Sequence, residues 1–522
     1  TALSRITGFL RLAAMAYALG VAESRVADTY SLANSTPNIV FELIIGGVLS
    51  SVLMREYIEV RETEGPQEAA LFIKRVMLVT TLILGVFTLI GIVAAPLVLK
   101  AYTFRSGHPD VELQRSVGTF LLRMFVPQIM FYGMSYISNA VLNAHRRFGP
   151  PMFAPALNNL LVTATFVALV ISFPDQTKDL SSLTTPALLL LGLGTTAGVA
   201  ALGLAPWISM KRVLGKVPRV SGLKDPRFPR LLRRSSYMVG YVITNQLGLW
   251  VALVLAARVQ GGVAGYQSAF VFFQLPHGLL AVSVATAIFP RMTESAVRKE
   301  HDRFALQVAQ GLRAIAFFVL PAIAGYIALG PDIIKLLLEH GSATSQSTEL
   351  IANILKYWAA GIFFFSSFYL VLRAFYALGD TRTPMLINLG ALGVNVVLDV
   401  VLFAAFSEPS MKIAGLAIGH AVSYAFAFAA GLIMLRKRVG GSASKGLAAT
   451  AGRALIASAA TGIAAWWIHR ASDGWMTAST LTTQILRIAV ATMGGLLLYV
   501  VAAKLLRLEE IAWISKLIPR RS

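Results

Sequence analysis

Cysteine is absent from the 522-residue chain, and charged residues are scarce at 14%. Without cysteine there is no disulfide, no thiol nucleophile and no cysteine-ligated metal. The chain also lacks a phosphate-binding loop ending in Gly-Lys-Ser/Thr, a Gly-x-Ser-x-Gly elbow and any cluster of residues at metal-ligand spacing. We therefore expect a protein that is neither an ATP-driven pump nor an enzyme and that needs no cofactor.

Apolar sequence takes the place of these features. Hydrophobic residues make up 56% of the chain, and the mean hydropathy is +0.68. Apolar windows of about 20 residues recur along the whole length, each long enough to cross a hydrocarbon core roughly 30 Å thick. We expect an all-α polytopic membrane protein with about fourteen transmembrane helices and no soluble domain. No charged segment precedes the first span, so we expect no cleaved signal peptide.

The net charge of +21 is distributed unevenly. Lysine and arginine gather in alternate loops, including the stretch 211–234, the run 436–438 and the C-terminal tail. Such alternation marks the cytoplasmic side of a membrane protein, and an even number of spans then places both termini there. Contact with anionic lipid explains this charge better than nucleic-acid binding, because no interleaved aromatic residues accompany it.

Charged residues interrupt the first two spans, where they are costly. Arg5 lies near a membrane surface, where it either snorkels to headgroups or lines a cavity. Arg11 lies deeper, where an arginine costs at least roughly 2.5 kcal/mol, so it faces either a watery cavity or an ion-pair partner. Glu42 is a candidate for that partner, or else titrates as a coupling group. Asp28 is either a helix cap or a functional carboxylate.

Polar residues beside proline mark two spans. Pro37 removes a backbone donor next to the amides of Asn34 and Asn38, which is typical of a membrane helix that bends. Gln274 and Pro276 repeat this pattern in the eighth span.

Further polar residues lie in the spans of the second half. Asn245 is in the seventh span, and His277 follows Pro276 as either a proton-linked or a packed, hydrogen-bonded residue. Transport could be coupled to protons or to sodium ions through groups such as Glu42, His277 or Asp399, or it could be driven by the membrane potential. The sequence leaves these alternatives open.

An internal repeat links two corners of the sequence. Val141-Leu142-Asn143-Ala144 matches Val371-Leu372-Arg373-Ala374, and Pro151-Met152 matches Pro384-Met385. An offset of about six spans predicts two six-helix lobes in parallel, pseudo-twofold repeat, followed by two extra helices. We expect alternating access between these lobes. His145, in the first corner, is better explained as a loop residue than as a metal ligand.

The expected domain boundaries follow from this repeat. They are an N-terminal lobe at 1–210 with helices 1–6, a basic cytoplasmic linker at 211–234, a C-terminal lobe at 235–436 with helices 7–12, and two extra helices with a basic tail at 437–522.

Several motifs, in order along the chain, resemble those of the bacterial MurJ/MviN lipid II flippases, members of the multidrug/oligosaccharidyl-lipid/polysaccharide exporter superfamily. They are Ser4-Arg5-x-x-Gly8-x-x-Arg11, Ala27-Asp28, Pro37-Asn38, Asn143-x-x-x-Arg147-Phe148-x-x-Pro151-x-x-x-Pro155 and Phe375-Tyr376-Ala377-Leu378-Gly379-Asp380-Thr381-x-Thr383-Pro384. The resemblance implies a monomer in the bacterial cytoplasmic membrane that moves undecaprenyl-diphosphate-linked disaccharide pentapeptide to the outer leaflet for peptidoglycan synthesis. It also implies a cationic cavity, an apolar groove for the lipid tail along the last two spans, and contacts with cell-wall synthesis proteins.

The resemblance and the polar pattern together select two groups of residues. Candidates for the substrate-binding cavity are Ser4, Arg5, Arg11, Asp28, Asn34, Asn38, Glu42, Asn245 and Gln274. Candidates for gating or hinge movement are Gly8, Pro37, Asn143, Arg147, Pro276, Arg373, Asp380 and Thr383.

Three positions depart from the family pattern. Leu12 stands where the family usually has an aspartate. An arginine typical of the second span falls at Glu42 or Phe41, and a cationic residue expected in the eighth span falls near Val271. These departures keep two alternatives open. One is an exporter of another polyprenyl-linked glycan, or an ion-coupled exporter of cationic drugs. The other is a flippase-derived scaffold that does not transport.

Overall fold

The computed structural model describes residues 2–46, 51–104, 106–215, 225, 227–474, 476 and 480–512, and all of its regular structure there is helical. The expected all-α membrane architecture is confirmed. The chain divides into two compact units, Thr1–Ala264 with His340–Ser347 and Gly265–Glu339 with Thr348–Ser522. Residues 216–224 and 226 of the expected linker at 211–234, and residues 513–522 of the basic tail, lie outside the described residues.

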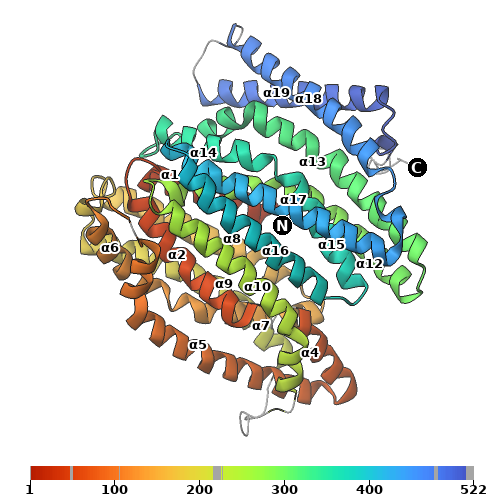
Figure 1. Ribbon diagram of the computed structural model, residues 1–522. Helices are drawn as coiled ribbons and strands as arrows, with labels where there is room; N and C mark the ends of the chain where they lie inside the picture. Colours follow the sequence, from red (N-terminus) through yellow and green to blue (C-terminus); the bar gives the residue numbers. More distant parts are fainter. Residues whose placement is uncertain are drawn as a thin grey trace. The chain divides into compact units, whose positions relative to one another are not determined.

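The first unit is built from long helices joined by short connections (Figure 1). Its helices are α1 (Ala2–Leu19), α2 (Val26–Phe41), the π turn η1 (Glu42–Gly46), α4 (Ser51–Thr63), α5 (Pro66–Tyr102), α6 (Val111–Phe125), α7 (Gln128–Ala144), α8 (Gly149–Ser172), the short 3₁₀ turn η2 (Leu180–Ser182), α9 (Thr185–Leu214) and α10 (Phe228–Ala256).

The second unit contains the remaining helices. They are α11 (Gly262–Pro276), which begins at the end of the first unit, the π turn η3 (His277–Ala281), α12 (Val282–Val297), α13 (His301–Leu338), α14 (Ser345–Ala359), α15 (Ile362–Ala377), α16 (Arg382–Ala405), α17 (Pro409–Val439), the 3₁₀ turn η4 (Gly441–Ser444), α18 (Leu447–Ala471), the 3₁₀ turn η5 (Ser472–Gly474) and α19 (Leu481–Leu505).

Proline and glycine set several helix ends. Proline stands in the first turn of α5, α8, α9, α10 and α17, where its fixed φ suits a helix and its missing N–H leaves no bond unmade. Gly215 (φ 65°) follows α9 and Gly440 (φ 92°) follows α17, in backbone conformations that other residues adopt at a cost.

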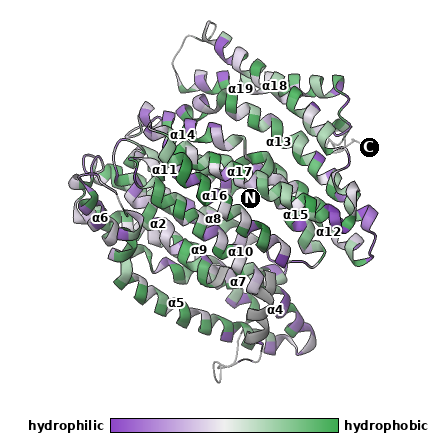
Figure 2. Cartoon of the chain, viewed as in Figure 1, coloured by the Kyte–Doolittle hydropathy of each residue, from purple (hydrophilic) through white to green (hydrophobic). Residues whose placement is uncertain are grey.

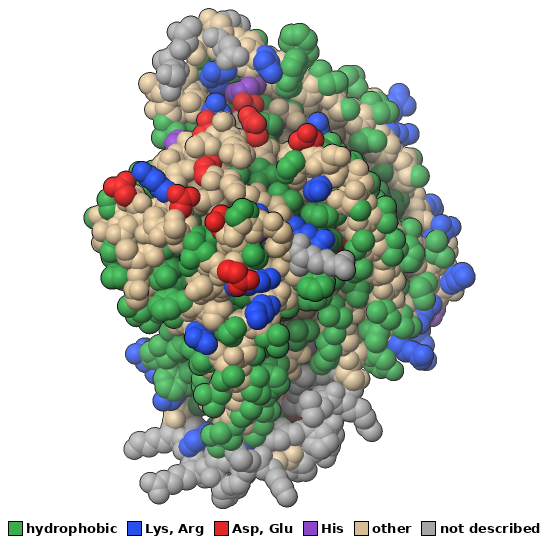
Figure 3. Space-filling model, turned by 60° about the vertical axis from the view of Figure 1, so that its left-hand side comes forward, with side chains coloured by type: hydrophobic (Ala, Val, Ile, Leu, Met, Phe, Trp, Pro, Cys, Tyr) green, Lys and Arg blue, Asp and Glu red, His purple; other side chains and the backbone are tan. Residues whose placement is uncertain are grey.

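Hydropathy agrees with membrane insertion. Within the described ranges, eleven helical segments are long and apolar enough to span a membrane, or twelve if α14 and α15, bent by 51°, count as one span. The expected first two spans are not in this set, because α1 carries two arginines in 18 residues and α2 has only 16 residues. Figure 2 shows hydrophobic residues along most of the helices, and Figure 3 shows broad apolar areas on the surface between charged side chains.

The order of helix breaks in the first half recurs in the second. A π turn follows α2 at Glu42–Gly46, and another follows α11 at His277–Ala281. A two-residue break separates α6 from α7, and another separates α14 from α15. The next helices, α8 and α16, both have 24 residues. This recurrence supports the repeat read from the sequence, while the lobe boundaries at 1–210 and 235–436 stay a prediction.

Each unit has its own aromatic core. In the first unit, the buried Tyr30 ring meets Phe125 and Phe166 edge to face, with ring centroids 5.8 and 5.4 Å away. In the second, Trp358 is fully buried between Tyr266 and Phe273, at 4.4 and 5.3 Å. Such pairs add to the free energy gained by burying the rings.

The last two helices pack on α13 and on each other, as Figure 1 shows. The Tyr499 hydroxyl donates a hydrogen bond to the Phe317 carbonyl of α13 at 2.6 Å. At the end of α19, Glu510 is 1% exposed and its Oε1 lies 3.1 Å from the Arg313 Nε. The two helices are therefore fixed to α13 by both packing and charge.

Candidate functional site

The polar start of α1 packs against α8. The Asn159 side-chain amide donates to the Ser4 carbonyl and to the Thr7 hydroxyl, both at 3.2 Å. A Cβ at Gly8 would lie 3.6 Å from the same amide nitrogen, an ordinary contact distance. Gly8 therefore faces α8 without being required by close packing. The Arg5 side chain is half-buried on this helix.

Arg11 and Glu42 both interact with tyrosines of α7. Arg11 is half-buried and interacts electrostatically with Tyr132. The Tyr136 hydroxyl, one turn further along α7, donates to Glu42 Oε1 at 2.8 Å. Four residues of helix correspond to about 6 Å. Glu42 thus has a hydrogen-bond partner on α7, whereas the interaction of Arg11 with this helix is electrostatic.

The ion pair between Arg11 and Glu42, one of the two alternatives for Glu42, is not formed in this structure. Among the residues that the structure describes, no salt bridge joins them, and the Glu42 carboxylate accepts a hydrogen bond from the Tyr136 phenol. Glu42 opens the π turn η1, and its backbone N–H donates to the carbonyls of Asn38 and Ile39. Leu12 is buried at 7% exposure, so no carboxylate stands beside Arg11 at that position.

The two asparagine side chains in the middle of α2 differ in exposure. Asn34 is half-buried, Asn38 is exposed, and Pro37 between them is buried inside the helix. Proline in this position weakens the local hydrogen bonding one turn before the π turn. A proline shortly before a π turn is an arrangement typical of a hinge, and the hinge role of Pro37 stays a prediction.

Asp28 is fully buried and caps another helix. Its Oδ2 accepts from the Gly261 N–H at 2.8 Å and its Oδ1 from the Ala264 N–H at 2.9 Å, at the start of α11. A carboxylate at a helix N-terminus satisfies otherwise unpaired donors and interacts favourably with the helix dipole. Of the two roles that the sequence left open, the structure shows capping, of α11 and not of its own helix.

Asp28 belongs to a larger contact that we call the three-loop latch. It joins the connections 20–25, 257–264 and 340–347, all within the first unit. The Arg25 guanidinium donates to the Ala257 carbonyl at 3.1 Å, and the Gln260 amide donates to the Ala22 carbonyl at 2.9 Å. Gly261 (φ 73°) lies so close to Ala22 that a Cβ there would clash at 2.6 Å.

Glu23 provides most of the latch's hydrogen bonds. Its Oε1 accepts from the backbone nitrogen and the hydroxyl of Thr344, both at 2.7 Å. Its Oε2 accepts from the Ser347 hydroxyl at 2.5 Å and from the Val21 N–H at 2.8 Å. Partial burial alone would raise the pKa of Glu23, but the hydrogen bonds from Ser347, Thr344 and Val21 lower that pKa overall.

Sequence reasoning missed Glu23, Arg25 and Gln260. No motif marks them. Arg25 and Gln260 bond to residues more than 230 positions away in the sequence, and Glu23 bonds to Thr344 and Ser347, more than 320 positions away. The signal that was available is local. Gly20, with φ 67°, forces a tight end on α1 and presents the next backbone N–H groups to an acceptor.

The first repeated corner follows α7. Asn143 is in the last turn of α7, and Arg147 is exposed just beyond it. His145 caps the helix, and its Nε2 lies 2.7 Å from the Tyr57 hydroxyl. Partial burial, with further contributions from Arg61 and Arg147, lowers the pKa of His145 below its usual value. His145 is thus a loop residue with a phenol partner.

The second corner is more tightly bonded. Asp380 Oδ1 accepts from the backbone N–H groups of Arg382 and Thr383 at 2.9 and 3.0 Å, while Oδ2 lies 2.5 Å from Arg438. Although burial opposes it, hydrogen bonding from Thr383 together with Arg438 lowers the pKa of Asp380. Arg373 donates to the Tyr369 hydroxyl at 2.7 Å and stacks over that ring.

The candidates of the seventh and eighth spans are spread out. Asn245 is exposed on α10, whereas Gln274 is half-buried and Pro276 is buried at the end of α11. His277 is 9% exposed, and its Nδ1 lies 3.1 Å from the Ser366 hydroxyl. This environment favours the packed, hydrogen-bonded alternative for His277.

Two further features of the second unit concern charge. Asp399 is 1% exposed, and its Oδ1 accepts from the Asn395 amide at 3.0 Å. Val271, where a cation was expected, is a half-buried valine on α11. In the described ranges, no three His, Asp or Glu residues are grouped for metal binding.

Comparison with known proteins decides the family. A family model described as "Lipid II flippase MurJ" matches residues 15–486. The chain belongs to the MurJ lipid II flippase family. Curated MurJ relatives include a probable lipid II flippase from Rhizobium tropici, 26% identical over 417 residues covering 79% of this chain and 75% of the relative. A MurJ protein from Burkholderia cenocepacia is 25% identical over 400 residues, covering 75% of this chain and 74% of the relative.

Solved structures agree on the fold. A lipid II flippase MurJ in an inward closed conformation matches with a TM-score of 0.75 and 20% identity, covering 96% of both chains. An inward-facing multidrug resistance transporter of the MATE family, in the MOP superfamily, matches with a TM-score of 0.67 and 11% identity, covering 85% of this chain and 99% of that one. The MurJ family is a family of transporters, so the expectation that the chain is not an enzyme is confirmed.

Proposed function

We propose that this chain moves lipid II from the inner to the outer leaflet of a bacterial cytoplasmic membrane by alternating access, in support of peptidoglycan synthesis. The observation that carries the proposal is the family match across residues 15–486, together with a MurJ fold over 96% of the chain. The latch supports alternating access, since three connections distant in sequence are held together by bonds that can be broken as a group.

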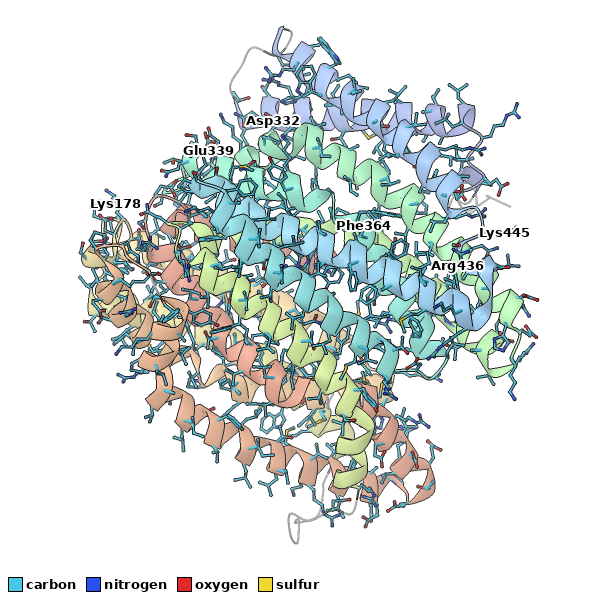
Figure 4. All side chains as sticks on the ribbon, viewed as in Figure 1. Lys178, Asp332, Glu339, Phe364, Arg436 and Lys445 are labelled. Atoms are coloured by element: carbon cyan, nitrogen blue, oxygen red, sulfur yellow. The ribbon has the colours of Figure 1, made fainter. Side chains whose placement is uncertain are left out.

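The orientation that we propose rests on charge. In the second unit, Asp332 and Glu339 lie towards one end of the helices, and Arg436 and Lys445 lie towards the other (Figure 4). Basic residues favour the cytoplasmic side. The latch connection 340–347 follows directly after Glu339, so it belongs to the outer side, and both termini belong to the cytoplasm.

Arg11 is the residue that we propose for the diphosphate. It is half-buried in α1 at a depth where an unpaired arginine is costly, and no ion pair neutralises it in the part of the chain described. A diphosphate would supply the missing negative charge. Arg5 and Ser4 belong to the same helix and extend the candidate site towards the cytoplasm. We keep Asn34, Asn38, Asn245 and Gln274 as further candidates for polar contacts with the substrate.

The hinge assignments also stay proposals. Pro276 stands directly before the π turn at His277–Ala281, and Pro37 stands a few residues before the π turn at Glu42–Gly46. Such turns are common at points where membrane helices bend. Asn143, Arg147, Arg373, Asp380 and Thr383 lie at the two repeated corners, where one helix of a lobe is connected to the next.

The direct test combines binding and growth. Purified full chain is titrated with lipid II and, separately, with undecaprenyl phosphate by native mass spectrometry, and Arg11→Ala is compared with Arg61→Ala, a matched loss of charge beside Glu62. We expect selective lipid II binding that Arg11→Ala weakens at least tenfold. We also expect Arg11→Ala, but not Arg61→Ala, to fail to complement a flippase-depleted strain. Equal binding of both lipids, or complementation by Arg11→Ala, would contradict the role of Arg11.

One observation favours a second candidate. Glu42 accepts a hydrogen bond from Tyr136 of α7 where the resemblance predicted an arginine, and Leu12 and Val271 replace two further charges. A site with fewer cations suits a lipid-linked glycan of different charge, or a cationic drug. This function would be supported if undecaprenyl phosphate and lipid II bound equally weakly and if the protein conferred drug resistance on a sensitive host. Tolerance of cavity substitutions but not of basic-loop substitutions would instead support a scaffold.

A further inference from the structure

Three residues other than glycine adopt the left-handed backbone conformation in the described chain, and all three are cations. They are Arg146 (φ 55°), Lys299 (φ 58°) and Arg507 (φ 53°). Steric contact between Cβ and the backbone makes this conformation unfavourable for residues other than glycine, with asparagine and aspartate the mildest exceptions. A long basic side chain at such a position is therefore retained against a backbone cost.

The three cations occupy the same place in the same motif. At the end of α7, the Arg146 N–H donates to the Asn143 carbonyl at 3.0 Å, and the next N–H donates to the carbonyl five residues before it at 2.8 Å. The same two bonds close α12 at Lys299 and α19 at Arg507. This is the Schellman end of a helix, whose left-handed residue is usually glycine.

The chain itself shows the glycine solution. At the end of α15, Gly379 (φ 76°) makes the same bond to the Tyr376 carbonyl at 3.0 Å, and the next N–H donates to Phe375 at 2.9 Å. Nothing lies within 4 Å of where its Cβ would be. The backbone motif thus needs no side chain, and the cations at the other three ends need a separate explanation.

The surroundings of the three side chains point to the membrane surface. Arg146, Lys299 and Arg507 are exposed, and within the described part of the chain none of their side chains forms a hydrogen bond or an ion pair. Each lies within two residues of a large apolar side chain that is strongly exposed: these are Phe148 at 52%, Val297 at 77% and Leu505 at 78%. An exposed apolar group beside an exposed cation, at the end of a membrane helix, matches the boundary between acyl chains and phosphates.

We propose that Arg146, Lys299 and Arg507 are three separate binding points for the phosphate of an anionic phospholipid. The left-handed backbone turns each side chain away from its own helix, the adjacent apolar residue enters the acyl region, and the cation meets the headgroup. The negative end of the helix dipole adds to the attraction for the cation itself. A phospholipid suits these points better than a protein partner, because each carries one unpaired cation and one apolar side chain.

The experiment uses the full chain and phosphatidylglycerol. The triple variant Arg146→Gly, Lys299→Gly and Arg507→Gly is compared with the unaltered protein by native mass spectrometry from mixed phosphatidylglycerol and phosphatidylcholine. We expect each substitution to weaken one phosphatidylglycerol-binding event about fivefold. In phosphatidylcholine alone, we expect the triple variant to melt at a temperature equal to or about 1–2 °C above that of the unaltered protein, because the backbone strain is removed.

Two control sets separate charge from strain and position. The first set, Arg146→Asn, Lys299→Asn and Arg507→Asn, introduces a side chain that tolerates the left-handed conformation. We expect this set to lose phosphatidylglycerol binding to the same extent as the glycine set. Lys178→Gln, Lys335→Gln and Arg470→Gln remove equal charge from exposed positions beyond the end of α8 and in the last turns of α13 and α18, and we expect these variants to keep phosphatidylglycerol binding. Unchanged phosphatidylglycerol binding in the glycine and asparagine sets, or an equal loss in the glutamine set, would overturn the proposal.

Discussion

One oxygen of Glu23 lies 2.7 Å from both the backbone nitrogen and the hydroxyl of Thr344. The connection between α1 and α2 is thereby bonded to the connection between α13 and α14, more than 300 residues later in the chain. Because the other oxygen holds Ser347 and the backbone of Val21, a single carboxylate secures both connections.

Glu23→Gln should weaken the latch by about 1–3 kcal/mol at pH 7, since hydrogen bonds to a charged acceptor are lost or weakened. The folded-state pKa of Glu23 is lowered, so its stabilising contribution is full above about pH 4.5 and is lost as the pH falls through the lower folded value. Melting temperatures measured from pH 8 to pH 3.5 should therefore differ by a constant amount between the two proteins down to about pH 5, and then converge.

Glu62→Gln is the matched control for this change. Glu62 is 66% exposed and pairs with the neighbouring Arg61, so its loss should change stability by less than about 0.5 kcal/mol. A Glu23→Gln protein that melts like the Glu62→Gln protein at pH 7 would show that the latch carboxylate contributes nothing.

Asp28→Asn should lower stability by about 1–3 kcal/mol. The substitution keeps the shape of the side chain but places an NH₂ group against the Gly261 or Ala264 N–H, in a site that is 0% exposed. Chemical unfolding followed by intrinsic fluorescence measures the difference. Asp175→Asn, at an exposed position paired with Lys178, should have no measurable effect, and an equal loss in both variants would exclude the capping role.

Arg313→Ala should loosen the last two helices. Glu510 is 1% exposed, and removing Arg313 leaves its carboxylate with only the Thr450 hydroxyl, at a cost of about 2–4 kcal/mol. Hydrogen exchange should increase in α18 and α19 but not in α1 or α2. Glu509→Gln removes the exposed partner of Arg313 and should leave exchange unchanged; faster exchange there would show that the surface charge matters instead.

Tyr136→Phe should lower stability by about 1 kcal/mol, because it removes the phenol that donates to Glu42. Combined with Glu42→Gln in a double-mutant cycle, the two changes should show a coupling energy of similar size. Tyr132→Phe, one turn earlier on α7, is the comparison. Strict additivity of Tyr136→Phe and Glu42→Gln would mean that the hydrogen bond contributes no free energy.

Much of the fold was predictable because its causes are local. Long apolar runs, the prolines at helix starts and the glycines at helix ends are visible in the sequence, and the corner at Asn143 is repeated at Arg373. The recurrence of the π turns and of the two-residue breaks was not visible, since a π turn differs from an α turn by a single residue and leaves the hydropathy unchanged.

The site was predictable only in part. Arg11 and Glu42 stand out in the sequence as isolated charges in apolar stretches, and their role in a cavity stays a prediction. The Tyr136 partner of Glu42 could not be predicted, because it is set by packing between helices. Asp28 was selected as a cavity residue by motif and by charge, a role that stays a prediction, and the structure shows its side chain buried as a cap of α11. Its partners at Gly261 and Ala264 are more than 230 residues away, beyond the reach of any periodicity or spacing argument.

The two π turns also change how the sequence of their helices has to be counted. Each π turn uses one residue more than an α turn, so every side chain after it is rotated by about 100° from where a continuous helical wheel would draw it. Deleting one residue from His277–Ala281 would restore an unbroken α-helix and turn the whole face of Val282–Val297, exchanging the neighbours of Met292 and Ser295, which are now buried. A single-residue deletion in this span is therefore equivalent to a change of the helix's entire packing surface.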